Sequence, residues 1–330
     1  MDNPGGSPDT QLAVMAAGLR LDDVPADVQQ AAVNCIVDTI AVALAGSGDI
    51  VSETIAQSLH DDGPAAVIGR GSASTRDAAL LNAVAAHVLD FDDWLPAAGI
   101  HPSTPVLAAA LAAAQSRPIP IAGRAFLAAY IAGFETQARI GASIAPMHYE
   151  AGFHPTATIG AFEAATAAAH VAGAPPAAME ATLGMVSTLA SAIRAAFGSS
   201  TKSIQVGKAA ENGVLAAELV AARASAPHDA VLGTQGFAAT HGHAVNHDIA
   251  TEPFGSHWYL REVAVKRHAS CFAHMPRSMR YSISGDTVHS TRWRNLTSRW
   301  LKSCARYVRF PRRHNPSKAS SAWHSPARWP

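Results

Sequence analysis

Alanine-rich stretches with helical spacing, separated by proline and glycine, constrain the fold more than any other feature. The first 274 residues hold 67 of the 71 alanines. Alanine is the best helix former. Between residues 25 and 44, apolar side chains also recur at the three-to-four spacing of a buried helix face. Aromatic residues make up only 6% of the chain, which disfavours a β-sandwich. The sequence therefore predicts a mainly α fold, built as a large alanine-rich helical domain.

Glycine and proline divide this part of the chain into separate predicted helices. We expect one short extended piece at 65–69 and helices over 25–44, 51–60, 76–90, 104–114, 121–140, 156–172, 177–194 and 209–224. The first ten residues have no apolar signal core, and no stretch reaches the ~18 apolar residues of a membrane span. Cys35, Cys271 and Cys304 are too scattered for a disulfide framework. These features predict a soluble cytoplasmic protein.

The composition changes abruptly after His274. Residues 275–330 carry twelve lysines and arginines against one acid, a net charge of +11, and the remainder carries −11. A change of reading frame in a GC-rich coding sequence replaces alanine, leucine and valine by arginine, serine and tryptophan, as seen here. The alternatives are a solvated basic tail and a nucleic-acid-binding segment. The tail has no helical period or motif, so we favour the frame change and expect 275–330 to be poorly ordered.

One polar cluster interrupts the helical pattern at His87, Asp90, Asp92 and Asp93, and His101 follows it. His87 and Asp90 are three residues apart, so the predicted helix places them on one face. Carboxylates near a helix C-terminus are disfavoured by the helix dipole unless they have partners. An imidazole beside a carboxylate is the minimum equipment for general acid–base catalysis. The alternative is a capped helix end with His87 packed in the core.

Two further segments suit an anionic ligand. His154 precedes a helix predicted to begin near Pro155, and a helix N-terminus favours an anion. Lys202 lies in a glycine- and serine-rich segment predicted to precede the next helix, which suits a carboxylate or a phosphate. The segment is not a Walker loop, because the required spacing is absent. The alternative for His154 is an ordinary histidine in a proline-containing turn.

Two histidine-containing segments complete the candidates. Residues 265–274 gather Lys266, Arg267 and two histidines around Cys271, and the alternative there is a basic surface loop. Residues 241–248 place three histidines at spacings that could bind a metal. No cysteine supports that second segment, so an exposed polar loop is favoured there and no metal is expected.

Taken together and in this order, the motifs resemble the MmgE/PrpD family, which includes 2-methylcitrate dehydratase and cis-aconitate decarboxylase. The segments that carry the resemblance are 81–93, 101–103, 152–156, 202–210, 232–237 and 265–271. The resemblance implies a large helical domain, a smaller α+β lid, dimers and no iron–sulfur cluster. The familiar pattern stops near residue 274, so we expect the lid to be largely missing. The expected organisation is a helical domain over 1–265, the start of the lid over 266–274 and the tail.

The resemblance also implies roles for single residues. It makes Asp90 and His101 an acid–base pair and His154 the second catalytic histidine. It places substrate carboxylates on Lys202 and Lys266, and Arg267 and Cys271 are expected to be further substrate-binding residues. Cys271 stands where the decarboxylase branch has a histidine, and Trp94 stands where many members have threonine.

The activity implied is that of a carbon–oxygen lyase without a cofactor, acting on a di- or tricarboxylate. Proton removal alpha to a carboxylate followed by loss of water, as in 2-methylcitrate dehydratase, is favoured because of Cys271. The alternatives are a cis-aconitate decarboxylase-like or isomerase activity, and an inactive truncated remnant. The expected partners are a small carboxylate and a second copy of the chain, with no membrane and no nucleic acid.

Overall fold

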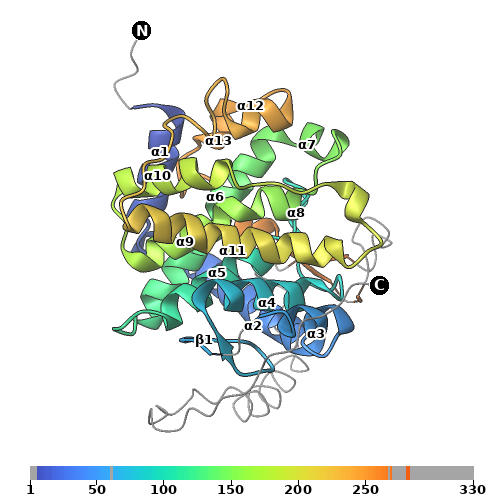
Figure 1. Cartoon of the computed structure of the whole chain (residues 1–330). Coiled ribbons are helices and arrows are strands. Elements are labelled where there is room, and N and C mark those ends of the chain that lie inside the picture. Colours follow the sequence, from blue (N-terminus) through green and yellow to red (C-terminus); the bar gives the residue numbers. More distant parts are fainter. Residues whose placement is uncertain (1–5, 60–61, 267, 270–279, 283–330) are drawn as a thin grey trace.

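The computed structural model describes residues 6–59, 62–266, 268–269 and 280–282 (Figure 1). Within these residues the fold is mainly helical, as predicted. The long helices are α1 (Pro8–Gly18), α2 (Ala26–Gly46), α4 (Thr75–His87), α5 (Ser103–Gln115), α6 (Gly123–Ile144), α9 (Gly160–Ala172), α10 (Pro176–Ser187) and α11 (Thr201–Ala221). The short helices are α3 (Ile50–Ala56), α7 (Met147–Glu150), α8 (Pro155–Thr158), α12 (Phe237–Gly242), α13 (His247–Ala250), η1 (Leu21–Asp23), η2 (Arg194–Ala196) and η3 (Tyr259–Glu262).

Helix α9 forms the centre of the molecule and packs against α5, α6, α10 and α11. Figure 1 shows α10, α11 and α4 one above another and running in roughly the same direction, and α9 packs against α10 and α11. Small side chains allow this close approach: a Cβ atom added at Gly213 of α11 would lie 2.4 Å from the Cβ of Ala164 in α9. The alanine-rich composition therefore supplies the packing as well as the helix propensity.

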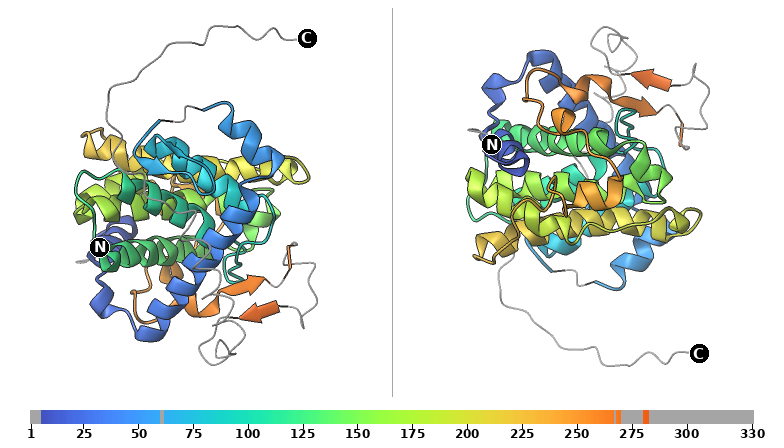
Figure 2. Two further views of the ribbon diagram at one scale, coloured as in Figure 1. Left: turned by 90° about the horizontal axis from the view of Figure 1, so that it is seen from below. Right: turned by 90° about the horizontal axis from the view of Figure 1, so that it is seen from above.

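The described strands are short and form two antiparallel pairs. Strand β1 (Ala65–Ala66) pairs with β2 (Ser72–Ala73), in the region expected to be extended. Strand β3 (Ala264–Lys266) pairs with β4 (Arg280–Ser282) at the edge of the helical body, where Figure 2 shows them as two orange arrows. Apart from β4, the predicted tail 275–330 lies outside the described residues.

Helix α2 is the one helix in the described part of the chain that is long and apolar enough to cross a membrane, with a mean hydropathy of 1.5. It packs against α4, α5 and α6 through one face. That face buries Val28, Ala32 and Cys35 in the main core. Its exposed positions include Asp27 and Gln30 but also Val33, which is 40% exposed, so the buried stripe is what marks α2 as a core helix of this domain.

Several helix boundaries differ from the sequence predictions. The helix predicted over 156–172 is divided into α8 and α9 at Ile159. Helix α4 ends at His87, three residues early, because Asp90 adopts a left-handed backbone with φ +50°. Helix α11 begins at Thr201, eight residues early, so Lys202 lies in its first turn instead of in a preceding loop.

A buried ion pair fixes the segment that leads into β3. Arg139 and Glu135 of α6 are both fully buried and lie 2.7 Å apart. The guanidinium of Arg139 donates hydrogen bonds to three backbone carbonyls in residues 252–257. The carboxylate of Glu135 accepts hydrogen bonds from the N–H groups of Tyr259 and Leu260. Together the two side chains attach residues 252–260 to the helical body.

Candidate active site

Residues from four separate parts of the chain meet beside the C-terminal end of α4. These parts are the end of α4 with the loop 88–102 that follows it, the start of α8, the first turn of α11 and strand β3. Trp94 in the loop exchanges both backbone hydrogen bonds with Ala264 of β3, at 2.9 and 2.8 Å. This pairing brings β3, and with it Lys266, against the loop.

Two lysines converge on the carboxylate of Asp90. Lys266 Nζ lies 2.7 Å from Oδ1 and 2.8 Å from the backbone carbonyl of Asp90, and Lys202 Nζ lies 3.0 Å from Oδ2. Burial alone would raise the pKa of Asp90, but the charges of His101, Lys266 and Lys202 outweigh burial and hold that pKa well below its usual range. Asp90 is therefore ionised and serves as the counterion of both lysines.

The imidazole of His101 lies between two carboxylates. Its Nε2 atom is 3.7 Å from Asp90 Oδ1, and its Nδ1 atom is 3.1 Å from Asp92 Oδ1. The ring also packs edge-on against Trp94, with the ring centres 5.1 Å apart. A proton placed on His101 is thus balanced by negative charge on both sides.

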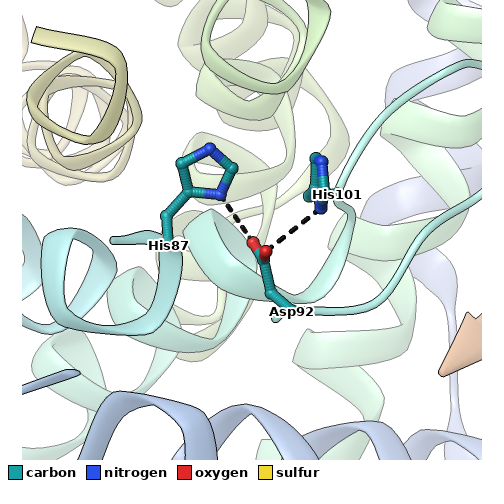
Figure 3. A group of neighbouring side chains, drawn as sticks. All are labelled: His87, Asp92 and His101. Atoms are coloured by element: carbon teal, nitrogen blue, oxygen red, sulfur yellow. Dashed lines mark hydrogen bonds and ion pairs between the residues drawn. The ribbon is translucent and has the colours of Figure 1, made fainter. Parts of the chain in front are cut away.

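His87 contacts the other side of Asp92 (Figure 3). Its Nδ1 atom is 2.7 Å from Asp92 Oδ2, which also accepts a hydrogen bond of 2.8 Å from the Thr104 hydroxyl. Burial, only partly opposed by Asp92, lowers the pKa of His87 to about 4. Burial would raise the pKa of Asp92, yet His101 and His87 hold it well below its usual range. His87 is neutral and Asp92 is ionised near neutral pH.

Asp93, although adjacent to Asp92, faces a different environment. Its carboxyl group accepts hydrogen bonds from the backbone N–H and the hydroxyl of Ser103, and the Ser103 hydroxyl is 2.6 Å from that of Tyr130. Burial is the main cause that raises the pKa of Asp93 to about 7. Neighbouring carboxyl groups with such different pKa values are typical of sites where protonation matters to function.

His154 lies at the start of α8, as the sequence predicts, although α8 is only four residues long. Its ring centre is 5.9 Å from that of His87 and 4.8 Å from that of Phe197. Burial first, and then the nearby positive groups, lower its pKa to about 2. Its Nδ1 atom is buried and has no hydrogen-bond partner among the described residues.

The structure brings five of the predicted site residues into one cluster: Asp90, His101, His154, Lys202 and Lys266. Arg267 and Cys271 lie outside the described residues. The prediction that Asp90 shares a helix face with His87 is wrong, because α4 ends before Asp90. The sequence analysis named His87 and Asp92 in the polar cluster but gave neither of them a catalytic or binding role. Their spacing from His101 was the available signal, but only the loop conformation brings the three together.

Metal-ligand spacing occurs in one group of described residues, His87, Asp92 and His101, whose potential ligand atoms lie within 4.8 Å of one another. These atoms already contact each other through the hydrogen bond and the ion pair described above. The three histidines of 241–248 do not converge: His241 stacks on Phe237, and His243 and His247 are exposed. The segment is not the single loop that the sequence analysis favoured, because His241 lies in α12 and His247 in α13.

The site therefore combines a lysine pair, buried neutral histidines and ionised carboxylates at one end of a helical domain. Known sequences identify this class of domain. The MmgE/PrpD N-terminal domain matches residues 10–249. The chain belongs to the MmgE/PrpD family, as the sequence motifs predicted.

Curated relatives are similar to the chain over about half to two thirds of its length. A cis-aconitate decarboxylase-like protein of Aspergillus oryzae is 32% identical over 66% of the chain and 47% of the relative. The cis-aconitate decarboxylase of Aspergillus terreus is 33% identical over 62% of the chain and 44% of the relative. The human cis-aconitate decarboxylase is 35% identical over 48% of the chain and 31% of the relative. The chain spans less than half the length of these curated relatives.

Proposed function

We propose that this chain provides the helical domain of a lyase that decarboxylates a tricarboxylate of the cis-aconitate type. The observation that carries the proposal is the convergence of Lys202 and Lys266 on Asp90 beside His101. The names of the relatives support this choice of substrate, and the family points to an enzyme of the decarboxylase and dehydratase group.

The lysine pair suits a substrate carboxylate because one of the two lysines, Lys202, is partly exposed to solvent. The side chain of Lys266 is fully buried, whereas 19% of Lys202 and 27% of Asp90 is exposed. A carboxylate that approaches the exposed edge meets Lys202 first and shares it with Asp90. Fixed cations around a carboxylate stabilise negative charge that develops on the adjacent carbon.

Decarboxylation at this site would proceed in two steps, with the lysines stabilising the negative charge that develops on the substrate. The bond between a substrate carbon and its carboxylate breaks, carbon dioxide leaves, and the electron pair remains on the substrate. A protonated His101 then delivers its proton to carbon, and solvent replaces that proton. His154, which is neutral and buried, supplies a second imidazole and excludes water from its side of the site.

Loss of water is the second candidate reaction. Cys271 favours it, because the resemblance places this residue where the decarboxylase branch has a histidine. In that case an imidazole removes the proton alpha to a carboxylate, and hydroxide leaves with a proton from a second acid. An isomerase activity would follow this loss of water by addition of water across the new double bond in the opposite orientation. An inactive remnant remains the alternative to all of these activities.

The test is to incubate the purified chain separately with cis-aconitate and with 2-methylcitrate. Carbon dioxide release reports decarboxylation, and absorbance of the new double bond reports loss of water. Lys202→Met should lower kcat/KM about 10²–10³-fold, since it removes one cation from the substrate carboxylate. Lys208→Met is the matched control, because Lys208 lies on the same helix and pairs with Glu211 at the surface. Turnover that survives Lys202→Met would overturn the assignment, and no turnover of either acid would favour the inactive remnant.

We also propose that the chain forms a homodimer in a soluble cytoplasmic form. Two apolar side chains beside the site support an interface there: Ile193 is 56% exposed and Phe197 is 40% exposed. Sedimentation of the purified chain tests this proposal. A single species of monomer mass at micromolar concentration would contradict it.

A further inference from the structure

The position of Asp92 between two histidine rings goes beyond the expected acid–base pair. We propose that Asp92 is a positioning residue that keeps the ring proton of both His101 and His87 on Nδ1. The Nε2 atom of His101 is then left as the atom that exchanges a proton with the substrate, and this last point rests on the proposed function.

The contacts of Asp92 carry this inference. The carboxylate is fully buried: its Oδ2 atom is hydrogen-bonded to His87 Nδ1 at 2.7 Å, and its Oδ1 atom forms an ion-pair contact with His101 Nδ1 at 3.1 Å that is not an aligned hydrogen bond. An ionised carboxylate only accepts hydrogen bonds, so the nitrogen atom facing it carries the proton. In the resulting tautomer, the Nε2 atom of each neutral ring has a free lone pair.

The direction of each free nitrogen atom fits this arrangement. In His101 the Nε2 atom faces Asp90 and therefore the lysine pair. In His87 the Nε2 atom lies on the ring edge away from Asp92 (Figure 3), is buried and has no hydrogen-bond partner among the described residues. Asp90 Oδ1 also faces His101 Nε2, but at 3.7 Å, so Asp92 Oδ1, at 3.1 Å from Nδ1, is the nearer of the two carboxylates.

The two oxygen atoms of Asp92 differ in a way that gives a sharp test. Oδ2 faces two donors, His87 Nδ1 and the Thr104 hydroxyl, whereas Oδ1 faces only His101. In Asp92→Asn the amide oxygen should take the position with two donors. The amide N–H group then faces His101 Nδ1, which must accept. The proton of His101 should move to Nε2, while His87 keeps its tautomer.

The experiment is ¹⁵N NMR of the histidine ring nitrogens in the full chain, which has 16 histidines. The variants His87→Gln and His101→Gln assign the two rings. In the unchanged protein, the neutral form of each ring should show a protonated Nδ1 atom and an unprotonated Nε2 atom. In Asp92→Asn, only His101 should exchange the two signals. This measurement needs no turnover, so it stands or fails independently of the proposed activity.

Two controls separate positioning from a general loss of structure. Thr104→Val removes a neighbouring hydrogen bond and should leave both tautomers unchanged. Glu262→Gln removes a carboxylate 2.9 Å from His257 at the surface and should leave both site histidines unchanged. A His101 signal that is the same with and without the Asp92 carboxylate would overturn the proposal, as would a His101 proton on Nε2 at the start.

Where turnover is measurable, the proposal makes a kinetic prediction as well. Asp92→Asn should lower kcat about 10²–10⁴-fold, the usual contribution of a general acid or base, and should change KM little. A proportional change in KM with constant kcat would show that Asp92 acts on substrate binding instead.

Discussion

The buried pair of Arg139 and Glu135 makes a strong prediction about stability. Arg139→Met leaves the Glu135 carboxylate buried without its cation. It also removes the donor from three backbone carbonyls in residues 252–257. Removing one partner of a buried pair costs about 3–5 kcal/mol, because the remaining charge stays out of water.

The assay is unfolding in urea followed by circular dichroism. With a slope of about 3 kcal/mol per molar urea, this loss lowers the midpoint by about 1–1.7 M. The matched control is Arg261→Met, which breaks an exposed pair with Asp27 that ties the same segment to α2. Exposed pairs contribute only about 0.2–1 kcal/mol, so the midpoint should move by less than about 0.4 M.

The double variant Glu135→Leu, Arg139→Met provides a further check. It removes both charges together, so its loss should be smaller than the sum of the two single losses. The explanation would be refuted if Arg139→Met destabilised the protein no more than Arg261→Met does. It would also be refuted if the two single losses were additive.

Three other changes should have measurable effects. Gly213→Ala should lower the free energy of unfolding by about 1–3 kcal/mol, because α9 leaves no space for a Cβ atom. Gly18→Ala, which meets no atom within 4 Å, should instead raise it by about 0.4–1 kcal/mol. Asp9→Ala leaves the buried N–H groups of Val231 and Leu232 without an acceptor, so thermal denaturation should show a loss of about 2–5 kcal/mol. Asp93→Asn tests a pH effect: the folded pKa of about 7 exceeds the ordinary 3.8, so the native state binds more protons between these values. The aspartate contribution to stability therefore falls as pH rises, and the variant should gain stability relative to the unchanged protein from pH 4 to 7. A constant difference across that range would contradict the assignment.

The helical domain was predictable because its signal is local. Alanine propensity and apolar spacing located α2, α5 and α6 to within a few residues of their observed ends. The break between α8 and α9 was missed, because the sequence there is apolar and continuous while the tertiary packing divides it. The start of α11 was missed because a glycine- and serine-rich segment is a weak helix signal that tertiary contacts overrode.

The candidate site was predictable only in part. Asp90, His101 and Lys202 were recognised as residue types in motifs, and the structure brings them together. The conformation of the loop 88–102 could not be predicted from the sequence. It depends on the left-handed backbone of Asp90 and on the Trp94–Ala264 pairing. Those two features decide that Asp92 faces the histidines and that Asp93 faces Ser103.

The separation of 176 sequence positions between Asp90 and Lys266 also bears on the order in which the site is assembled. A chain made from its N-terminus folds its first elements before its last ones are available. Lys202 arrives with α11, but Lys266 arrives only when β3 pairs with the loop at Trp94. Until then Asp90 has one lysine partner instead of two. During synthesis, the second lysine therefore becomes available to Asp90 only after all the residues of α1 to α11 have been made.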